Sequence, residues 1–257
     1  MRELWPNRTM LYGGVSPTRV DAIDRIDELV DVYAVNGVKF YPHDLIDGRI
    51  SALDLGDVDK IFPVLQRVQD RGIKVIGVHK AMPLGRGPIG PLKMDDIQHA
   101  AHAFPDLTFE IVHGGVAFVE ETSVLMQSYA NVVVNLEVTS GFAKVAPRRF
   151  AEAMATFLSV PFGADRIIWG TGCDLAHPRP LIEAFWNFEM PEDLLEGWGV
   201  PPLTQEAKKK ILGANFLRIH GIDPDDVRKR VAGDEFDTDE LLEPWSGQIE
   251  PVPMAAV

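Results

Sequence analysis

Two histidines and an aspartate each follow a run of hydrophobic residues, and these residue types are common metal ligands. They are His79, His113 and Asp174. One strand–helix repeat takes ~30 residues or more, so the first interval suits one repeat and the second suits two. If the strands are parallel, all their carboxyl ends lie at one edge of the sheet and these side chains meet there. Such a group would suit activation of water by a divalent metal ion.

The elements that must position these residues alternate between strand and helix patterns. Hydrophobic runs predict six strands, near residues 10, 39, 76, 110, 134 and 168. Helical spacing of apolar residues predicts helices over 20–34, 58–69, 95–104, 117–129, 147–158, 181–188 and 204–219. This alternation predicts an α/β protein with a parallel sheet. A closed (β/α)8 barrel needs eight strands, so we expect a TIM-barrel-like fold that is incomplete.

The chain is expected to form one barrel-like domain over residues 1–222. Residues 223–257 should hold a C-terminal helix and then an acidic, proline-containing tail, either loosely packed or wrapped around a partner. Within the domain, the segment 80–93 is rich in glycine and proline. A long loop of that composition suits a substrate lid better than a core.

Composition narrows the functional class. The 257 residues carry a formal net charge of −13, which argues against nucleic-acid binding and against docking on an anionic membrane. Cys173 is the single cysteine, so no internal disulfide is possible. No apolar run approaches the ~20 residues of a membrane span, and the first 30 residues lack the pattern of a signal peptide. We therefore expect a cytoplasmic protein acting on a small molecule.

Several ordered segments resemble the amidohydrolase-related family, in particular its branch of aminocarboxymuconate semialdehyde decarboxylase-like enzymes. The segments are 37–42, 75–79 with its terminal histidine, 104–115 with His-Gly-Gly, 166–174 and 211–219. The stretch 104–115 is the most specific of them. Five matches in order, over nearly the whole chain, make the resemblance strong in fold and ancestry.

The resemblance implies roles for the three residues named first. His79 and Asp174 would be metal ligands, with zinc as the expected ion, and His113 would act as the acid or base beside the metal-bound water. Asp174 would also accept a proton in catalysis. A bound metal ion lowers the pKa of its water toward ~7, which makes hydroxide available at neutral pH.

One family feature is missing from this sequence. The family begins with a strand that carries a His-x-His pair of metal ligands, and no His-x-His occurs here. The similarity starts at the family's third strand, so the first two strand–helix units would be absent. A fragment, a second polypeptide that supplies the missing part, and a natural short form with another role all agree with this pattern.

Four further side chains are candidates for substrate binding on the same face. Lys80 and Arg86 follow His79 and could hold a substrate carboxylate, or they could be solvated loop cations. His43 lies about one repeat before His79, so it could replace a lost metal ligand, bind substrate or lie only at the rim of the site. His177 belongs to the loop after the last strand. A fifth residue, Glu137, ends the run before that strand and could face the mouth of the site or be capped by neighbouring groups.

Two functions remain in view at this stage. The first is a metal-dependent hydrolase of C–N or C–O bonds, or a decarboxylase, acting on a small carboxylated substrate. The second is a metal-free relative that serves as an assembly subunit, because an open barrel exposes sheet edges that a second copy or a partner chain must cover. Phosphate-loop, Gly-x-Ser-x-Gly and Cys-x-x-Cys motifs are all absent from the sequence.

Overall fold

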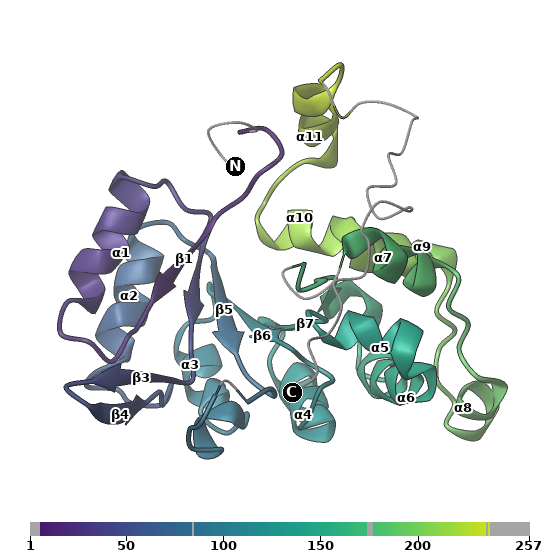
Figure 1. Ribbon diagram of the computed structural model, residues 1–257, viewed down its shortest axis with the longest axis horizontal. Coiled ribbons are helices and arrows are strands. Elements are labelled where there is room, and N and C mark those ends of the chain that lie inside the picture. The colour runs from purple at the N-terminus through teal and green to yellow at the C-terminus, as the bar shows by residue number, and fades with distance from the viewer. Residues whose placement is uncertain (1–5, 84, 174–176, 235, 237–257) are drawn as a thin grey trace, which may run out of the picture.

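The computed structural model describes residues 6–83, 85–173, 177–234 and 236. Its centre is a six-stranded sheet in the order β1-β2-β5-β6-β7-β8, and every neighbouring pair is parallel (Figure 1). The strands are β1 (Tyr12–Val15), β2 (Gly37–Phe40), β5 (Val75–His79), β6 (Thr108–Val112), β7 (Val132–Asn135) and β8 (Ile167–Ile168). The predicted α/β class and the six predicted strands are confirmed, and the sheet of the described residues is not a closed barrel.

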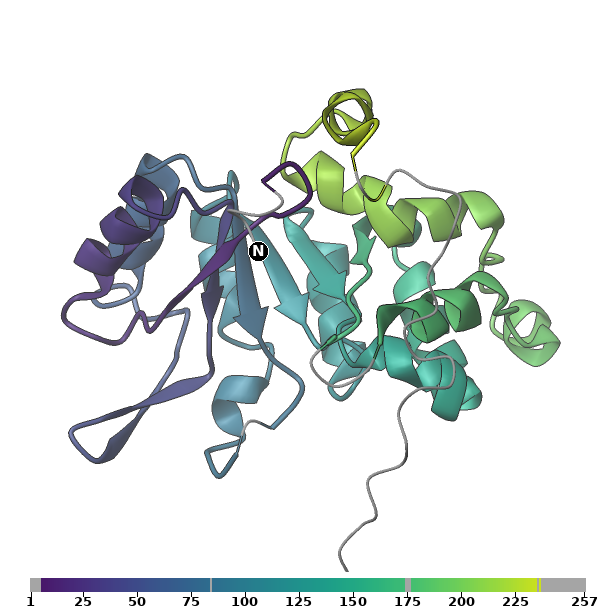
Figure 2. The same cartoon turned by 45° about the horizontal axis from the view of Figure 1, so that its top comes forward.

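Helices cover the convex face of the sheet and continue beyond β8 (Figures 1 and 2). They are α1 (Ala22–Asp31), α2 (Phe62–Asp70), α3 (Ile97–Ala103), α4 (Val119–Ser128), α5 (Thr139–Val145), α6 (Pro147–Leu158), α7 (Pro178–Trp186), α8 (Glu192–Gly197), α9 (Gln205–Lys209), α10 (Asn215–Ile219) and α11 (Pro224–Val231). A π-helical turn, Lys210–Ala214, joins α9 to α10. Every predicted helix overlaps an observed one, whereas α5 and α8 were not predicted. Within the described part of the chain, no helix combines the length and apolar character needed to cross a lipid bilayer.

The segment after β2, for which the sequence predicts neither a helix nor a strand, contains regular structure. Residues 43–57 contain an antiparallel hairpin of β3 (His43–Ile46) and β4 (Arg49–Ala52). Its two-residue turn is Asp47-Gly48, and both residues have positive φ, as a type I′ turn requires. The Asp-Gly pair was therefore the available signal for this hairpin.

The two faces of the sheet differ in chemistry because side chains alternate along each strand. Val38, Phe40, Ile76 and Phe109 are fully buried in the main core. The intervening residues face the concave side, where Lys39 pairs in register with Gly77 and Gly77 pairs with Glu110. This level therefore places two charged residues on either side of a glycine.

The amino ends of the strands are closed on the concave side by α10. Ile219 packs with Val75, Val133 and Ile168 in a second, smaller core, and Phe216 lies against it. Asn215, the first residue of α10, fixes this helix to β8. Its side-chain amide donates to the backbone oxygens of Ala164 and Ile167, at 2.8 Å each. The concave face is thus filled at one end and open at the other.

The last described helix lies near the start of the chain. The side-chain amide of Asn7 donates to the backbone oxygen of Arg230 in α11, and Arg8 forms an ion pair with Asp234 at 2.6 Å. The predicted boundary at residues 222 and 223 stays a prediction, and most of the expected tail lies outside the described residues.

The chain turns sharply at the carboxyl ends of the central strands. Ala81 after β5, His113 after β6 and Val138 after β7 all have positive φ, which is unfavourable for residues other than glycine. The next residue, Gly114, packs directly against β7. A Cβ atom there would overlap Cγ2 of Val134, a fully buried residue.

We predict that Gly114→Ala destabilises the fold by roughly 1–3 kcal/mol, because Val134 is held in a dense core and has little freedom to move. Urea unfolding of the variant and the wild type measures this loss in the free energy of unfolding. The matched control is Gly141→Ala in α5, where an added Cβ meets no atom within 4 Å. That control should leave stability unchanged or raise it by ~0.5–1 kcal/mol, as alanine favours helix. Equal unfolding midpoints for the two variants would contradict the packing argument.

Candidate functional site

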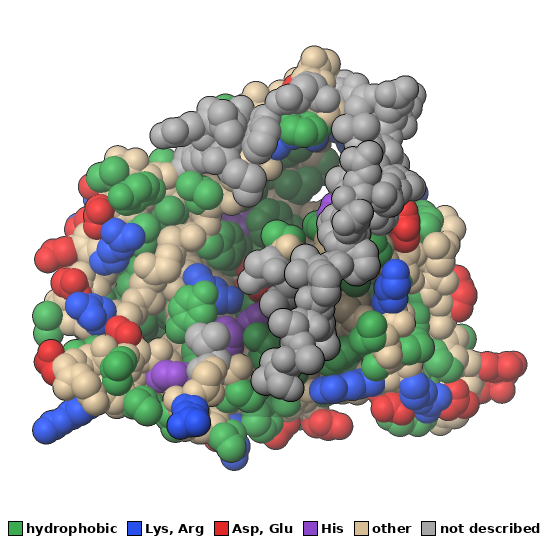
Figure 3. Space-filling view, viewed as in Figure 1, with side chains coloured by type: hydrophobic (Ala, Val, Ile, Leu, Met, Phe, Trp, Pro, Cys, Tyr) green, Lys and Arg blue, Asp and Glu red, His purple; other side chains and the backbone are tan. Residues whose placement is uncertain are grey.

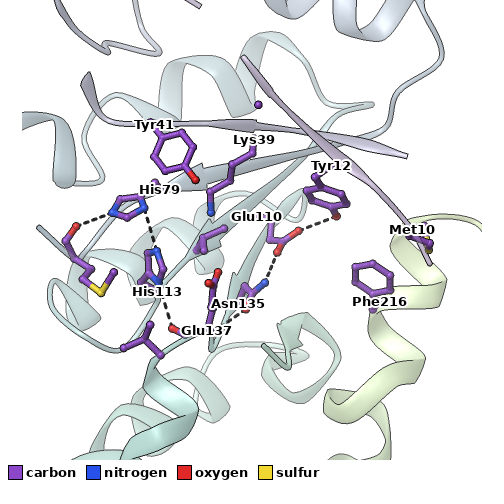
Figure 4. Close-up of a pocket in the computed structure, with 14 residues that line it drawn as sticks. Met10, Tyr12, Lys39, Tyr41, His79, Glu110, His113, Asn135, Glu137 and Phe216 are labelled. Atoms are coloured by element: carbon purple, nitrogen blue, oxygen red, sulfur yellow. Dashed lines mark hydrogen bonds between the residues drawn. The ribbon is translucent and has the colours of Figure 1, made fainter. Parts of the chain in front are cut away.

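A cavity of about 550 Å³ opens on the concave face toward the carboxyl ends of the strands. Its polar wall residues come from five strands or strand ends: Tyr12, Lys39, Tyr41, His79, Glu110, His113, Asn135 and Glu137 (Figure 4). Figure 3 shows histidine and basic side chains near the middle of this side of the molecule, among hydrophobic ones. The position agrees with the rule that such folds bind ligands at the carboxyl ends of the strands.

His79 and His113 lie side by side at the ends of β5 and β6. Nδ1 of His79 is 3.0 Å from Nε2 of His113, and the ring centroids are 4.4 Å apart. Both residues are almost fully buried, with 2% and 4% exposed. The predicted convergence of these two histidines is therefore seen in the structure.

Backbone carbonyls decide which ring nitrogens carry protons. Nε2 of His79 lies 2.8 Å from the backbone oxygen of Met82, so this nitrogen must carry a proton to donate. A neutral His79 then has its lone pair on Nδ1, facing Nε2 of His113. The other nitrogen of His113, Nδ1, is 3.4 Å from the backbone oxygen of Glu137. Forming all three contacts needs three protons on the four ring nitrogens. A neutral pair carries only two, so one of the three hydrogen bonds is not formed.

Burial keeps this pair neutral. Together with a smaller effect of the Lys39 charge, it lowers the pKa of His79 and that of His113 from 6.5 to about 4. Desolvation is the larger cause because both rings are shielded from water. At neutral pH the cavity thus holds two uncharged imidazoles, the form that binds metal ions and accepts protons.

A second buried network surrounds the carboxyl group of Glu110. Tyr12 donates its hydroxyl proton to Oε2 of Glu110 at 3.0 Å, and the amide of Asn135 donates to Oε1. Nε2 of His220 lies 2.7 Å from the Tyr12 hydroxyl and donates to it. Burial raises the pKa of Glu110 and is only partly offset by these hydrogen bonds. Asn135 also accepts from the backbone N–H of Glu137 at 2.8 Å, which fixes that strand end.

Lys39 is the basic residue on the cavity wall. Burial lowers the pKa of its amine from 10.5 to about 8, against the opposing attraction of Glu137 and Glu110. The amine lies 5.8 Å from the centre of the Tyr41 ring. It therefore remains mostly a cation at pH 7, in a site where charge is poorly solvated.

The third predicted chemical residue, Asp174, lies outside the described residues. Among the described residues, no group of three or more His, Cys, Asp or Glu side chains is arranged to hold a metal ion. The metal and catalytic roles of Asp174, His79 and His113 therefore stay predictions.

The structure places the predicted substrate-binding residues away from the cavity wall. Lys80 is fully buried, and its amine donates to the backbone oxygen of Pro91 at 2.8 Å and to Asp96 at 2.7 Å. As the neighbour of His79 in the chain, it points to the helix side of the sheet. The expected role of Lys80 in binding substrate is therefore corrected to tying the 80–93 loop to the start of α3.

Three other predicted binding residues also lie outside the cavity lining. Arg86 is exposed on its loop. His43 begins β3, and its ring is packed against Gly87. His177 is exposed and caps α7 by accepting a hydrogen bond from the backbone N–H of Arg179 at 3.2 Å. Local hairpin and capping geometry thus outweighs the spacing argument for His43 and His177.

Comparison with known protein families identifies the family of this chain. The family model described as Amidohydrolase matches residues 4–222. The chain belongs to the amidohydrolase family. No curated protein matches the sequence significantly.

Solved structures similar to this amidohydrolase family member support the barrel-type fold. An uncharacterised TIM-barrel protein from Bordetella bronchiseptica is 20% identical with a TM-score of 0.60, over 86% of this chain and 69% of that one. A 2,6-dihydroxybenzoate decarboxylase from Rhizobium is 13% identical with a TM-score of 0.58, over 86% and 73%. A dihydroxybenzoic acid decarboxylase from Polaromonas sp. JS666, with bound manganese and the inhibitor 2-nitroresorcinol, is 12% identical with a TM-score of 0.58, over 86% and 71%.

Five polar wall residues escaped the sequence analysis: Tyr12, Lys39, Tyr41, Glu110 and Asn135. Lys39 and Glu110 were detectable, because each is a charged residue inside a hydrophobic strand at a position that alternates with buried neighbours. Tyr12 and Asn135 gave no such signal, since tyrosine and a strand-terminal asparagine are common in sheets.

Protonation of the buried histidines should destabilise the metal-free protein in acid. The pKa of His220 is also lowered by burial to about 4. Between pH 4 and 6.5 the unfolded chain therefore binds more protons than the folded one, so the free energy of unfolding falls as pH drops, by up to roughly 1 kcal/mol per pH unit for each histidine. Urea titrations from pH 7 to 4.5 with a chelator present measure the slope.

The His79→Asn and His113→Asn variants should each show a shallower decline than the wild type. His102→Asn, an exposed residue of α3, is the control and should keep the wild-type slope. A wild-type slope in both site variants would show that the imidazoles are not the groups responsible.

Proposed function

We propose that this chain is a divalent-metal-dependent decarboxylase or hydrolase that acts on a small carboxylated substrate. The observation that carries the proposal is the pair of neutral imidazoles at the cavity, where the Met82 carbonyl directs the lone pair of His79 toward His113. Histidines that bind metal ions commonly donate their other N–H to a backbone carbonyl in this way. Family membership supports the same class.

The donor set fits a divalent ion in part. His79 offers Nδ1, and Asp174, which lies outside the described residues, is proposed as the carboxylate ligand. Zinc is the proposed ion, although manganese is bound in one of the similar decarboxylases. Such an ion, when bound, would polarise an oxygen of substrate or water.

His113 is proposed as the acid or base. While its Nε2–H donates to His79, its lone pair is directed at the Glu137 carbonyl oxygen, which cannot donate a proton. If His79 Nδ1 is occupied by a ligand, the neutral His113 gains by carrying its proton on Nδ1, where the Glu137 oxygen accepts it. Its lone pair then lies on Nε2, so the nitrogen nearest His79 is free to accept a proton.

Decarboxylation is the reaction we place first. Two of the similar solved structures are decarboxylases of dihydroxybenzoic acids. The wall of the cavity here combines the Tyr41 ring with polar groups, as a small planar acid would need. Hydrolysis remains the second reaction of the same proposal.

An assembly role is the second candidate function. In the described residues the outer edge of β1 pairs with no other strand, whereas the β8 edge is held by Ile211, whose backbone oxygen accepts from Trp169 N–H at 3.0 Å. An unpaired edge can bind a strand of a second copy or of another protein. Homo-oligomerisation is proposed on the same ground.

Metal analysis tests the enzyme proposal directly. After incubation with zinc or manganese and desalting, the wild type should hold about one equivalent, and His79→Ala and Asp174→Ala should hold far less. Carbon dioxide release from 2,6-dihydroxybenzoate and related acids should fall more than about 100-fold in both variants, since even the loss of an outer-shell partner costs 10–100-fold.

His102→Ala is the matched control and should retain metal and turnover. The enzyme proposal fails if metal content is the same in all four proteins, or if turnover persists after complete chelation. An oligomer that remains assembled in that case would favour the second candidate.

A further inference from the structure

Lys39 is a cation without a partner of its own on the cavity wall. Among the described residues, no carboxylate oxygen lies within the 4.0 Å of an ion pair, and no hydrogen-bond acceptor is seen for its amine. Lys80 shows the contrast, because its buried amine has both a carboxylate and a carbonyl partner. Figure 4 shows the Lys39 amine directed into the cavity, between Tyr41 and Glu110.

The Lys39 side chain has glycines beside it on both neighbouring strands. Lys39 pairs in register with Gly14 on one side and Gly77 on the other, so neither neighbouring strand has a side chain at that level. A Cβ on Gly77 would lie 3.3 Å from Cδ of Lys39, within tight contact. The aliphatic part of the lysine therefore lies over β5, and its amine extends to the cavity.

The surrounding groups leave the positive charge only partly compensated. Glu110 is engaged by Tyr12 and Asn135, and burial raises its pKa toward the neutral form. His79 and His113 are uncharged at neutral pH. Glu137 is the other carboxyl group on the described cavity wall, and it too lies beyond ion-pair distance of Lys39. An ammonium group has three N–H donors, so this site is well suited to an anionic acceptor.

We propose that Lys39 binds the carboxylate of a small aromatic acid, with the ring of that acid lying against Tyr41. This inference rests on the proposed function and names the group that would hold its substrate. Tyr41 is 43% exposed and its ring centre is 5.8 Å from the Lys39 amine, so one planar molecule reaches both. Its ring is also 5.5 Å from that of His79, which brings such a ligand to the histidine pair.

Equilibrium binding of benzoate to chelator-treated protein tests the proposal without any need for metal or turnover. Isothermal titration should show benzoate binding at least about tenfold more tightly than benzamide, its neutral counterpart. Lys39→Met should weaken benzoate binding about 10–100-fold and leave benzamide binding nearly unchanged, because a charge-assisted hydrogen bond to a half-buried cation is stronger than one between neutral groups. Lys39→Arg should retain most of the benzoate affinity.

Arg86→Met is the matched control, since it removes a cation from the loop above the site, and it should bind benzoate like the wild type. The proposal is overturned if benzamide binds wild type as well as benzoate does, or if Arg86→Met loses the preference and Lys39→Met keeps it. The first comparison needs no variant, so it stands even if a substitution impairs folding. Loss of metal binding would refute the proposed function while leaving this result intact.

Discussion

The in-register parallel pairing of β2, β5 and β6 is the constraint on which the site depends. Because side chains alternate along a strand, this register places Lys39, Gly77 and Glu110 on one level of the concave face. One level closer to the cavity mouth, His79 pairs with Val112 and Val112 with Asn135. A slip of one residue in β5 would turn His79 into the hydrophobic core and Lys80 into the cavity, so the packing of Ile76 and Val78 beneath the helices also fixes the chemistry.

Burying polar side chains on the concave face costs free energy, and hydrogen bonds to specific partners offset most of that cost. Glu110 receives two hydrogen bonds, Tyr12 links it to His220, and Asn135 uses its remaining oxygen to fix the backbone of Glu137. These bonds rely on α10, because His220 follows its last turn and Ile219 seals the amino ends of the strands. The helix that closes the amino ends of the strands is therefore also linked, through His220 and Tyr12, to Glu110 on the cavity wall.

Much of the fold followed from local patterns, but the site followed only in part. Hydrophobic runs and helical spacing predicted all six strands, and the positions of His79 and His113 at strand ends predicted their meeting. Lys80 was misassigned because proximity to His79 in sequence was weighed above the alternation of side chains, which sends adjacent residues to opposite faces. The long-range partners of Glu110 could not be predicted at all, since Tyr12, Asn135 and His220 come together only through the register and the placement of α10.

The two unusual features of the cavity point to the same physical conclusion. The imidazole pair has one proton too few for its three hydrogen-bonding contacts, and the Lys39 amine has donors but no acceptor among the described residues. Glu110 and Lys80 differ in this respect, because each of these buried groups has two hydrogen-bond partners. Lys39 is half-buried and the histidine pair is buried, so an added partner at either place would make interactions that the described residues do not supply. A ligand that brings negative charge to Lys39 and a Lewis acid at His79 would supply both missing interactions, so one bound state resolves both defects.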